Sequence, residues 1–352
     1  MVTLKDIAER AGVSIMTVSR VMNDKKGKVS PETSERVRRI AKEMGYIPNS
    51  TARSLAARSS KIIAVILRDE PATNPLEIPY NAAFLGKIVK ILPACGYSIM
   101  VHFVQNFSDV TFWLKSWNAE GAIFLGIFDR EIRQIRNDNQ IPLVFTDSYS
   151  NVRRINNVGI DDYKGGQLAA ECFLSHGHTR LAFAGPISSG VIAERLQGFS
   201  DRLRSAGHPL LPEQTHAFPD RSAADILKSI RESDPAPTGL FVTSDNAAAE
   251  FYEAARRAGV SIPDDLSVIG FDDFPVSQML TPALTTIRQD MEEKAQQTCR
   301  ILLDRLNNCS SPSEILCLDV NLVERDSVRD LRTPAASPSP LTGERGESGV
   351  TP

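Results

Sequence analysis

The feature that most constrains the fold is a series of short apolar runs. Helical stretches separate most of the runs, and strands that alternate with helices predict βαβ units and a parallel sheet. The segment containing them spans about 270 residues, which is generous for one doubly wound sheet. We therefore expect two doubly wound parallel sheets that face each other across a cleft. The runs are Ile62 to Leu67, Ile99 to Val104, Ala122 to Leu125, Leu143 to Phe145, Leu181 to Ala184, Leu240 to Val242 and Ser267 to Phe271.

Composition predicts a cytoplasmic globular chain. The longest purely apolar run has six residues, whereas a bilayer span needs roughly 18 or more. No apolar segment follows a basic start at Met1, so we expect neither a transmembrane helix nor a secretory signal. The five cysteines are scattered and form no CxxC pair, which is typical of reduced thiols in the cytoplasm. We expect no zinc site and no cofactor.

The net charge is unevenly distributed. Residues 1–61 carry +7 and the remainder carries −10, within a total of −3. A small basic head on an acidic body indicates that the head meets a polyanion, with chance clustering on a solvated surface as the alternative.

The head is expected to contain three short helices. Thr3 can cap a first helix that ends at Gly12, and Ser14 can cap a second helix that runs to about Met22. Only three residues separate these two helices, which is the pattern of a helix-turn-helix. After a basic loop, Ser30 can cap a third helix that begins with Pro31 at its first position.

The second helix has two distinct faces. Val18, Val21 and Met22 fall on one side, whereas Met16, Ser19 and Arg20 fall on the other with Ile15 at its edge. Exposed apolar side chains and an arginine suit a recognition helix, because they can contact thymine methyl groups and guanine in the major groove. Packing against a neighbouring domain is the alternative. The DNA contacts that we expect in this part of the head are Thr3, Ser14, Ile15, Met16, Thr17, Ser19, Arg20 and Asn23, followed by Tyr46.

A possible hinge follows the head. Asn49 after Pro48 can cap a helix of about eight residues, which is too short to be stable alone in water. Leu55 is its one large apolar side chain, and it suits a wedge in the minor groove while arginines hold phosphates. We expect Asn49, Ala52, Arg53 and Leu55 to contact DNA; a plain linker is the alternative.

Several motifs closely resemble the lactose-repressor (LacI/GalR) family of bacterial transcription regulators. The resemblance covers residues 2 to about 328. In the head it rests on Leu4 to Ser14, Thr17 to Val21, Gly45 to Asn49 and Ala52 to Leu55. In the body it rests on Gly159 to Asp161, Gly177-His178, Gly185-Pro186, Arg195 to Phe199, Thr243 to Asp245, Gly270 to Asp273 and Thr281 to Ile287.

The resemblance implies a domain organisation: a small all-α helix-turn-helix head and an α/β two-lobed body that looks like a periplasmic sugar-binding protein. The expected parts are residues 1–48 for the head, 49–61 for the hinge helix and linker, and 62–330 for the body. The N-lobe is then about 62–160 plus 291–318, and the C-lobe about 161–290 plus 319–330. Residues 331–352 are rich in Pro, Gly and Ser and are expected to be a disordered tail. The tail has no leucine heptad of the kind that forms tetramers in some relatives, so we expect a homodimer.

Candidate effector contacts follow the predicted strands. Asp147, Ser244, Asp245 and Asp272 come directly after apolar runs, where loops face the cleft. The family pattern implies that Tyr80, Arg195, Phe218 and Gln289 also line it, alongside Asp147 and Asp272. Carboxylates accept hydrogen bonds from hydroxyl groups, arginine donates in a fixed fork, and aromatic rings cover apolar sugar faces. Each of these residues could instead be an ordinary cap or surface ion pair.

Three departures from the family pattern bear on the ligand. Asn81 replaces a second aromatic residue, Ser189 stands where purine-binding relatives have arginine, and Glu70 to Ile78 looks like an insertion. We therefore expect a sugar or polyol rather than a purine base. His176 and His178 lie in a Ser-His-Gly-His-Thr segment before a strand, which we interpret as a structural turn and not as a metal site.

These features predict a transcriptional regulator and, more specifically, a repressor. We expect it to bind a pseudo-palindromic operator on the nucleoid and to respond to a small effector. A carboxylate-dependent enzyme that uses Asp245, Asp272 and Asp273, or a plain sugar-binding module, is the alternative. The common nucleotide-binding, metalloprotease and serine-hydrolase motifs are absent from the sequence. The basic helix-turn-helix head favours a regulator over an enzyme.

Overall fold

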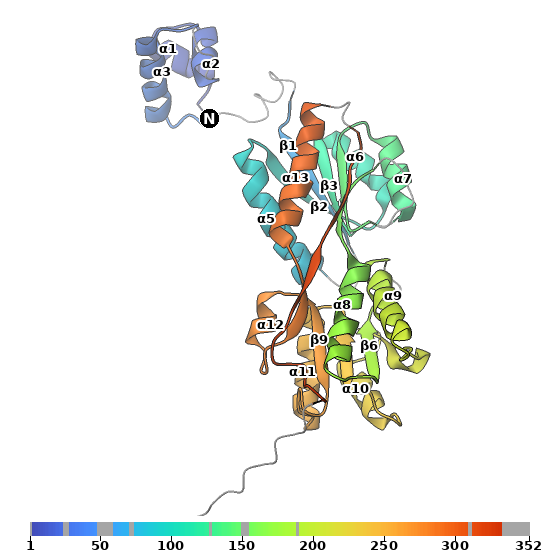
Figure 1. The fold of residues 1–352 in the computed structure, drawn as a ribbon. Helices are drawn as coiled ribbons and strands as arrows, with labels where there is room; N and C mark the ends of the chain where they lie inside the picture. The colour runs from blue at the N-terminus through green and yellow to red at the C-terminus, as the bar shows by residue number, and fades with distance from the viewer. Residues whose placement is uncertain are drawn as a thin grey trace, which may run out of the picture.

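A computed structural model describes residues 2–23, 28–47, 59–69, 74–126, 129–148, 155–187, 190–308 and 312–332. They form an α-helical head and an α/β body with two six-stranded sheets (Figure 1). None of the helices in these ranges is long and apolar enough to cross a membrane.

The head consists of α1 (Leu4–Ala11), α2 (Ile15–Met22) and α3 (Pro31–Glu43). Each begins at the cap expected from the sequence, because the side chains of Thr3, Ser14 and Ser30 accept backbone N–H bonds from the first turn. Gly12 ends α1 with φ = 64°, a left-handed conformation that glycine adopts without a Cβ clash. Fully buried Ile7, Val18 and Val37 form the centre of the small core, which confirms the predicted helix-turn-helix.

The first sheet, with its helices, forms the N-lobe. Its order is β11-β5-β4-β3-β1-β2, and every pairing in it is parallel. The helices α5 and α13 lie side by side on one face, and α6 and α7 cover the other (Figure 1). The strands are β1 (Ile62–Arg68), β2 (Ser98–Val104), β3 (Gly121–Leu125), β4 (Leu143–Thr146), β5 (Asn156–Ile160) and β11 (Ile315–Leu318). The helices are α5 (Pro79–Ala94), α6 (Val110–Ser116), α7 (Asp129–Asp138) and α13 (Met291–Asn307), with a 3₁₀ turn at Phe107–Asp109.

The second sheet, with its helices, forms the C-lobe. Its order is β12-β10-β9-β8-β6-β7, with only the β10–β12 pairing antiparallel among those described. One face is covered by α8 and α9 and the other by α10 and α11. The strands are β6 (Leu181–Gly185), β7 (Thr215–Ala217), β8 (Gly239–Val242), β9 (Ser267–Asp272), β10 (Thr285–Gln289) and β12 (Val320–Val323). The helices are α8 (Asp162–Ser175), α9 (Gly190–Ser205), α10 (Ala223–Glu232), α11 (Asp245–Ala258) and α12 (Pro275–Met279), with a 3₁₀ turn at Pro212–Gln214.

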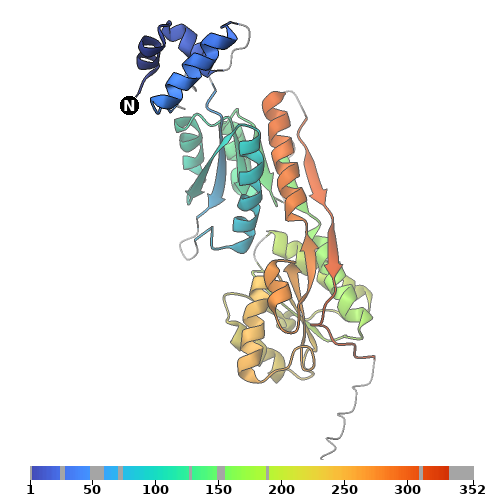
Figure 2. The same ribbon diagram turned by 90° about the vertical axis from the view of Figure 1, so that its left-hand side faces the viewer.

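The chain crosses between the two lobes after β5, after β10 and between β11 and β12 (Figure 2). The crossovers bring the ends of β4, β9 and β10 and the first turns of α5 and α13 into one region. A polar cluster occupies this region.

Candidate functional site: the exposed face of α2 and a polar cluster between the lobes

The helix α2 presents apolar side chains to solvent. Ile15 is 50% exposed and Met16 is 63% exposed, whereas Val18 and Val21 are buried in the head core. Ser19 and Arg20 are partly exposed. This outward face is therefore suited to reading base edges, as expected for a recognition helix.

Other predicted DNA contacts take part in capping. Thr3 donates its backbone N–H to Asp6 at 2.8 Å, Ser14 accepts from the backbone N–H of Thr17 at 3.1 Å, and the Asn23 amide donates to the Ser19 carbonyl oxygen at 2.8 Å. Their side chains stay exposed at helix ends, where they can also meet phosphate groups.

Tyr46 packs partly against the head core. Asn49, Ala52, Arg53 and Leu55 lie outside the described residues, so their roles stay predictions.

The chain is well anchored where it enters the N-lobe. The Ser60 hydroxyl donates to the Asn118 carbonyl oxygen at 2.6 Å, and the Lys61 backbone N–H donates to Glu120 Oε1 at 3.0 Å. The Ser59 hydroxyl also donates to Glu120. Residues 59–61 therefore move with the N-lobe.

The N-lobe contributes three converging side chains to the polar cluster. Asp147 follows β4 with φ = 53°, which turns its carboxylate away from the strand direction. The Tyr80 hydroxyl, from the first turn of α5, donates to this carboxylate. The Lys294 ammonium group, from α13, lies 2.5 Å from Asp147 Oδ1 and 5.0 Å from the centre of the Tyr80 ring. The Lys294 side chain is 1% exposed, so this ion pair is almost dry.

The C-lobe contributes the facing groups. Gln289, at the end of β10, donates from Nε2 to Asp272 Oδ1 at 2.6 Å, and its Oε1 lies 3.4 Å from Lys294 Nζ. Asp272 ends β9 with φ = 111°, a strained conformation that aims its carboxylate toward the cluster. We define the inter-lobe cluster as Tyr80, Asp147, Asp162, Arg195, Asp272, Gln289 and Lys294.

Arg195 reaches the cluster because α8 and α9 pack unusually close together. A Cβ atom at Gly166 would lie 2.0 Å from the Arg195 carbonyl oxygen, and one at Gly198 would lie 1.9 Å from the Tyr163 carbonyl oxygen. The Arg195 guanidinium then donates to Asp162 Oδ1 at 2.7 Å and to the Thr243 carbonyl oxygen at 2.6 Å. The ion pair is buried, with side-chain exposures of 8% and 0%.

Burial shapes the electrostatics of the cluster. It raises the pKa of Asp272 to about 6, although the Arg195 guanidinium and the Gln289 amide oppose the rise. Burial and the Asp147 carboxylate raise the pKa of Tyr80 well above its usual value, so its hydroxyl group remains a donor. The cluster thus combines donors, acceptors and an aromatic ring, which are the groups that hold a hydroxylated ligand.

Two of the predicted contacts, Asp245 and Ser244, form hydrogen bonds within the C-lobe. Asp245 is fully buried, and its oxygens accept from the Phe274 backbone N–H at 2.7 Å and the Thr286 hydroxyl at 2.6 Å. Ser244 caps α11 by accepting from the Ala247 N–H at 3.2 Å. We assign Asp245 and Ser244 to the support of the cluster, because their polar atoms already have these internal partners.

Phe218 is 6% exposed and packs on Phe251, with ring centroids 5.4 Å apart. It belongs to the core between the second sheet, α10 and α11. Its expected contact with a ligand has no support in this geometry.

Lys294 and Asp162 were not among the residues expected from the sequence. Lys294 could have been noticed, because it lies on the same helical face as the buried residues Met291, Ala295 and Thr298. A lysine on a buried helix face needs a partner. That partner, Asp147, is 147 residues away in the sequence.

The departures from the family pattern are partly visible. The Asn81 amide donates to the Pro75 carbonyl oxygen at 2.9 Å and so holds the described end of the insertion. Ser189 and residues 70–73 lie outside the described residues. His178 is buried. Its Nδ1 lies 2.9 Å from the Thr238 hydroxyl and its Nε2 lies 2.9 Å from the Arg329 carbonyl oxygen, as expected for a structural turn.

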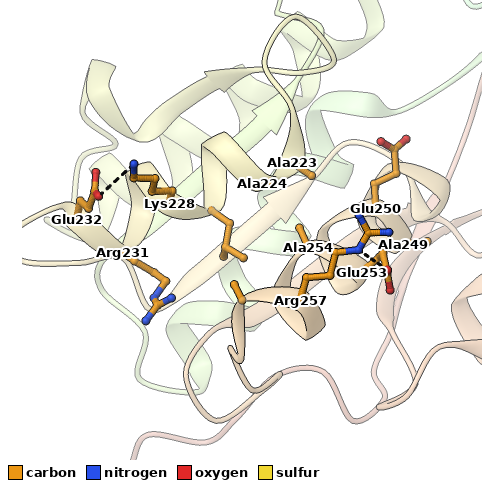
Figure 3. Close-up of a pocket in the computed structure, with 12 residues that line it drawn as sticks. Ala223, Ala224, Lys228, Arg231, Glu232, Ala249, Glu250, Glu253, Ala254 and Arg257 are labelled. Carbon is orange, nitrogen blue, oxygen red and sulfur yellow. Dashed lines mark hydrogen bonds and ion pairs between the residues drawn. The ribbon is translucent and has the colours of Figure 1, made fainter.

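A groove of about 990 Å³ lies apart from this cluster, between α10 and α11 (Figure 3). Alanines and Leu227 form much of its lining, and two of its charges form the Lys228–Glu232 pair. Glu253 is likewise paired with Arg257 at 2.6 Å. No set of polar groups converges here as it does in the inter-lobe cluster, so the cluster is the better candidate ligand site.

Comparisons with known proteins agree with this organisation. The sequence profile "Bacterial regulatory proteins, lacI family" matches residues 3–49, and the profile "Periplasmic binding protein-like domain" matches residues 170–328. The transcriptional regulator DegA of Bacillus subtilis is 30% identical over 344 residues, which cover 94% of this chain and 99% of that protein. The ribose operon repressor of Haemophilus influenzae is 29% identical, with 94% and 100% covered.

Solved structures extend the likeness to the whole fold. A lac repressor dimer bound to operator and an anti-inducer has a TM-score of 0.82 at 27% identity, with 93% of this chain and 99% of that chain covered. A complex of the transcriptional regulator CelR with cellobiose has a TM-score of 0.69 at 26% identity, with 93% and 100% covered. The chain belongs to the lacI family of bacterial regulatory proteins.

Proposed function

We propose that the protein is a sequence-specific transcriptional repressor whose affinity for operator DNA is controlled by a small hydroxylated effector, a sugar or polyol. The observation that carries this proposal is the inter-lobe cluster, which joins buried donors, acceptors and a ring where the lobes meet. The names of related proteins support it, since one is a ribose operon repressor and one was solved with cellobiose.

Control follows from unequal affinity for two lobe arrangements. Effector hydroxyl groups would exchange bonds with Asp147 and Lys294 on one lobe and with Asp272 and Gln289 on the other. Such a ligand binds more tightly to the lobe spacing in which the groups of both lobes can bond to it. It therefore increases the fraction of the protein in that arrangement. Because residues 59–61 are fixed to the N-lobe, the shift would reposition the segment that leads to the head.

We propose that the working unit is a homodimer on a pseudo-palindromic operator, where the two copies of residues 49–57 support each other in the minor groove. A lac repressor solved as a dimer on operator supports this assembly. Such binding would place the protein on the nucleoid in the cytoplasm.

We propose that the carboxylates of the C-lobe do not perform catalysis. The related proteins named above are transcription regulators. Asp273 is engaged by Arg288 at 2.6 Å and by Arg325 at 2.5 Å, and Asp245 has its internal partners. These bonds engage two of the three carboxylates that the enzyme alternative would use, and so support a structural role for both.

The test begins with selection of binding sites from random duplexes, followed by thermal-shift screening of the full chain against sugars, polyols and nucleosides. A ligand at 100 times its Kd adds about 2.7 kcal/mol of stability. A sugar or polyol that stabilises the protein should also change operator affinity in fluorescence anisotropy. Failure of every stabilising ligand to change DNA binding would refute the control mechanism, and turnover of a sugar would reopen the enzyme alternative.

A further inference from the structure

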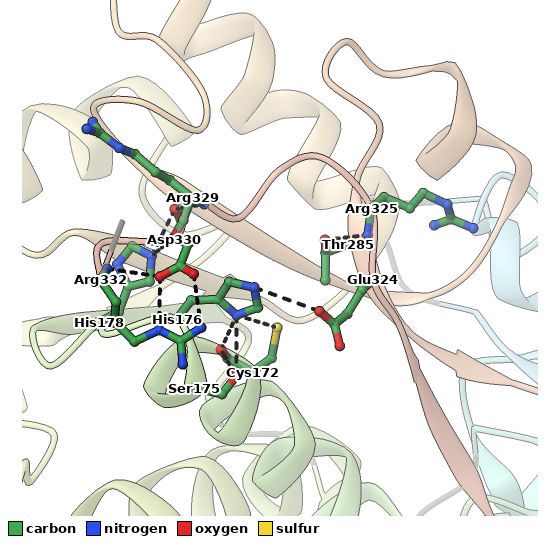
Figure 4. A network of polar contacts seen from close by, with 11 residues as sticks. Cys172, Ser175, His176, His178, Thr285, Glu324, Arg325, Arg329, Asp330 and Arg332 are labelled. Carbon is green, nitrogen blue, oxygen red and sulfur yellow. Dashed lines mark hydrogen bonds and ion pairs between the residues drawn. The ribbon is translucent and has the colours of Figure 1, made fainter. Parts of the chain in front are cut away.

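A second group of ligating side chains lies in the C-lobe, away from the inter-lobe cluster. Cys172 is in the last turn of α8, His176 caps that helix, and Glu324 directly follows β12. One donor atom from each side chain lies within 4.8 Å of the other two (Figure 4). Cys172 and His176 share a helix face because they are four residues apart.

The hydrogen bonds of His176 fix the orientation of its ring. His176 Nδ1 lies 2.8 Å from the Cys172 carbonyl oxygen, and a carbonyl oxygen can only accept, so Nδ1 carries the hydrogen. Nε2 is then the ring nitrogen that faces Glu324 Oε2, at 3.8 Å, and its lone pair can bind a cation. An Nδ1–H bond to a backbone carbonyl is the usual support of a metal-binding histidine.

The donor set selects the class of metal. A thiolate, an imidazole and a carboxylate suit zinc, whereas Mg²⁺ and Ca²⁺ prefer oxygen ligands alone. Zinc bonds of about 2.0–2.3 Å place tetrahedral ligand atoms roughly 3.5 Å apart. His176 Nε2 and Glu324 Oε2 are 3.8 Å apart, so these two ligand atoms are close to this spacing before any adjustment.

Glu324 gives the group access to solvent. Its side chain is 61% exposed, so its carboxylate can swing inward and an ion can enter past it. The Cys172 side chain is buried, and a thiol binds metal as the thiolate, so its proton leaves to solvent as the metal–sulfur bond forms.

We propose that Cys172, His176 and Glu324 bind one divalent ion of the zinc class per chain, with water completing the coordination. The ion would fasten the segment after β12 to the end of α8 and so stabilise the C-lobe. The neighbouring His178 takes no part, because its ring nitrogens contact the Thr238 hydroxyl and the Arg329 carbonyl oxygen. The site is independent of the effector proposal.

The test uses the reduced, chelator-treated full chain and Co²⁺ as a spectroscopic probe. The background carries Ala in place of Cys95, Cys309 and Cys317, which leaves Cys172 and the buried Cys299 as its thiols. One equivalent of Co²⁺ should produce a thiolate-to-cobalt charge-transfer band, which one equivalent of Zn²⁺ abolishes. Zn²⁺ should also raise the melting temperature.

Three variants separate the ligands. Cys172→Ala should lose the charge-transfer band, and His176→Gln and Glu324→Gln should each weaken Co²⁺ binding at least tenfold. The matched control is His208→Gln, which changes a histidine outside the group and should leave the titration unchanged. If Cys172→Ala fails to fold, the two surface variants decide the question. Absence of the band in excess Co²⁺, its survival in Cys172→Ala, or unchanged affinity in both His176→Gln and Glu324→Gln overturns the proposal.

Discussion

The buried Lys294–Asp147 ion pair should make Asp147→Asn strongly destabilising. Asparagine has nearly the same side-chain shape as aspartate and also tolerates φ = 53°. It lacks, however, the negative charge that faces Lys294. At 2.5 Å and an effective dielectric constant of about 20, the pair attracts by about 7 kcal/mol before desolvation is subtracted. Loss of one partner from a buried pair costs about 3–5 kcal/mol net. The side-chain Oε1 of Gln289 still accepts from Lys294 Nζ at 3.4 Å, so we expect a loss at the lower end of that range.

The assay is urea and thermal unfolding of the full chain, with circular dichroism as the readout. A loss of 3–5 kcal/mol corresponds to a decrease of roughly 6–20 °C in the melting temperature of a body of this size. The double variant Asp147→Asn with Lys294→Met removes both charges and should recover to within about 1 kcal/mol of the wild type.

Glu253→Gln is the matched control, because it breaks solvent-exposed pairs with Arg256 and Arg257 and should leave the melting temperature nearly unchanged. If Asp147→Asn behaves like this control, the cluster is hydrated and the reasoning fails.

Three further predictions address the head, the buried acid and the assembly. Arg20→Ala should cost about 1–3 kcal/mol of operator affinity and relax preference at one base pair per half-site; equal weakening on all sequences in binding-site selection would make Arg20 a phosphate contact. Burial raises the pKa of Asp245 to about 8, so the folded protein holds a proton that the unfolded chain loses near pH 4, and its contribution to stability is lost as the pH rises through that window. In urea unfolding from pH 4 to 8, the free energy of unfolding of Asp245→Asn should therefore rise relative to that of the wild type as the pH increases. A difference that does not change with pH would contradict the raised pKa of Asp245. The full chain should sediment as a dimer, and a stable tetramer would contradict the proposed homodimer.

Local signals in the sequence predicted local structure well. The caps at Thr3, Ser14 and Ser30 depend on hydrogen bonds within one turn, so the sequence around each residue is sufficient to find them. The apolar runs of β1, β6, β8 and β9 were likewise found, because both faces of those strands are buried. The strands β5, β7, β10 and β12 were missed because polar residues interrupt their sequences. The edge strand β11 was missed although its four residues are apolar.

The candidate site was predicted less completely, because it depends on contacts between distant segments. Asp147 and Asp272 follow apolar runs and were found from that position, whereas Gln289 was implied by the family resemblance. Asp245 also follows a strand, yet α11 and the Thr286 hydroxyl from a neighbouring strand enclose it. Lys294 was missed because only the folded chain brings it to Asp147.

The most direct test of the central claim is a reciprocal binding measurement on one preparation of the wild-type protein. Operator affinity is measured with and without saturating effector, and effector affinity is measured with and without saturating operator. If the inter-lobe cluster controls the head, the two ratios must be equal and should lie between about 5 and 150. Asp272→Asn should bring both ratios close to one while operator affinity without effector stays near that of the wild type. An effector that binds equally well to free and operator-bound protein would contradict the account.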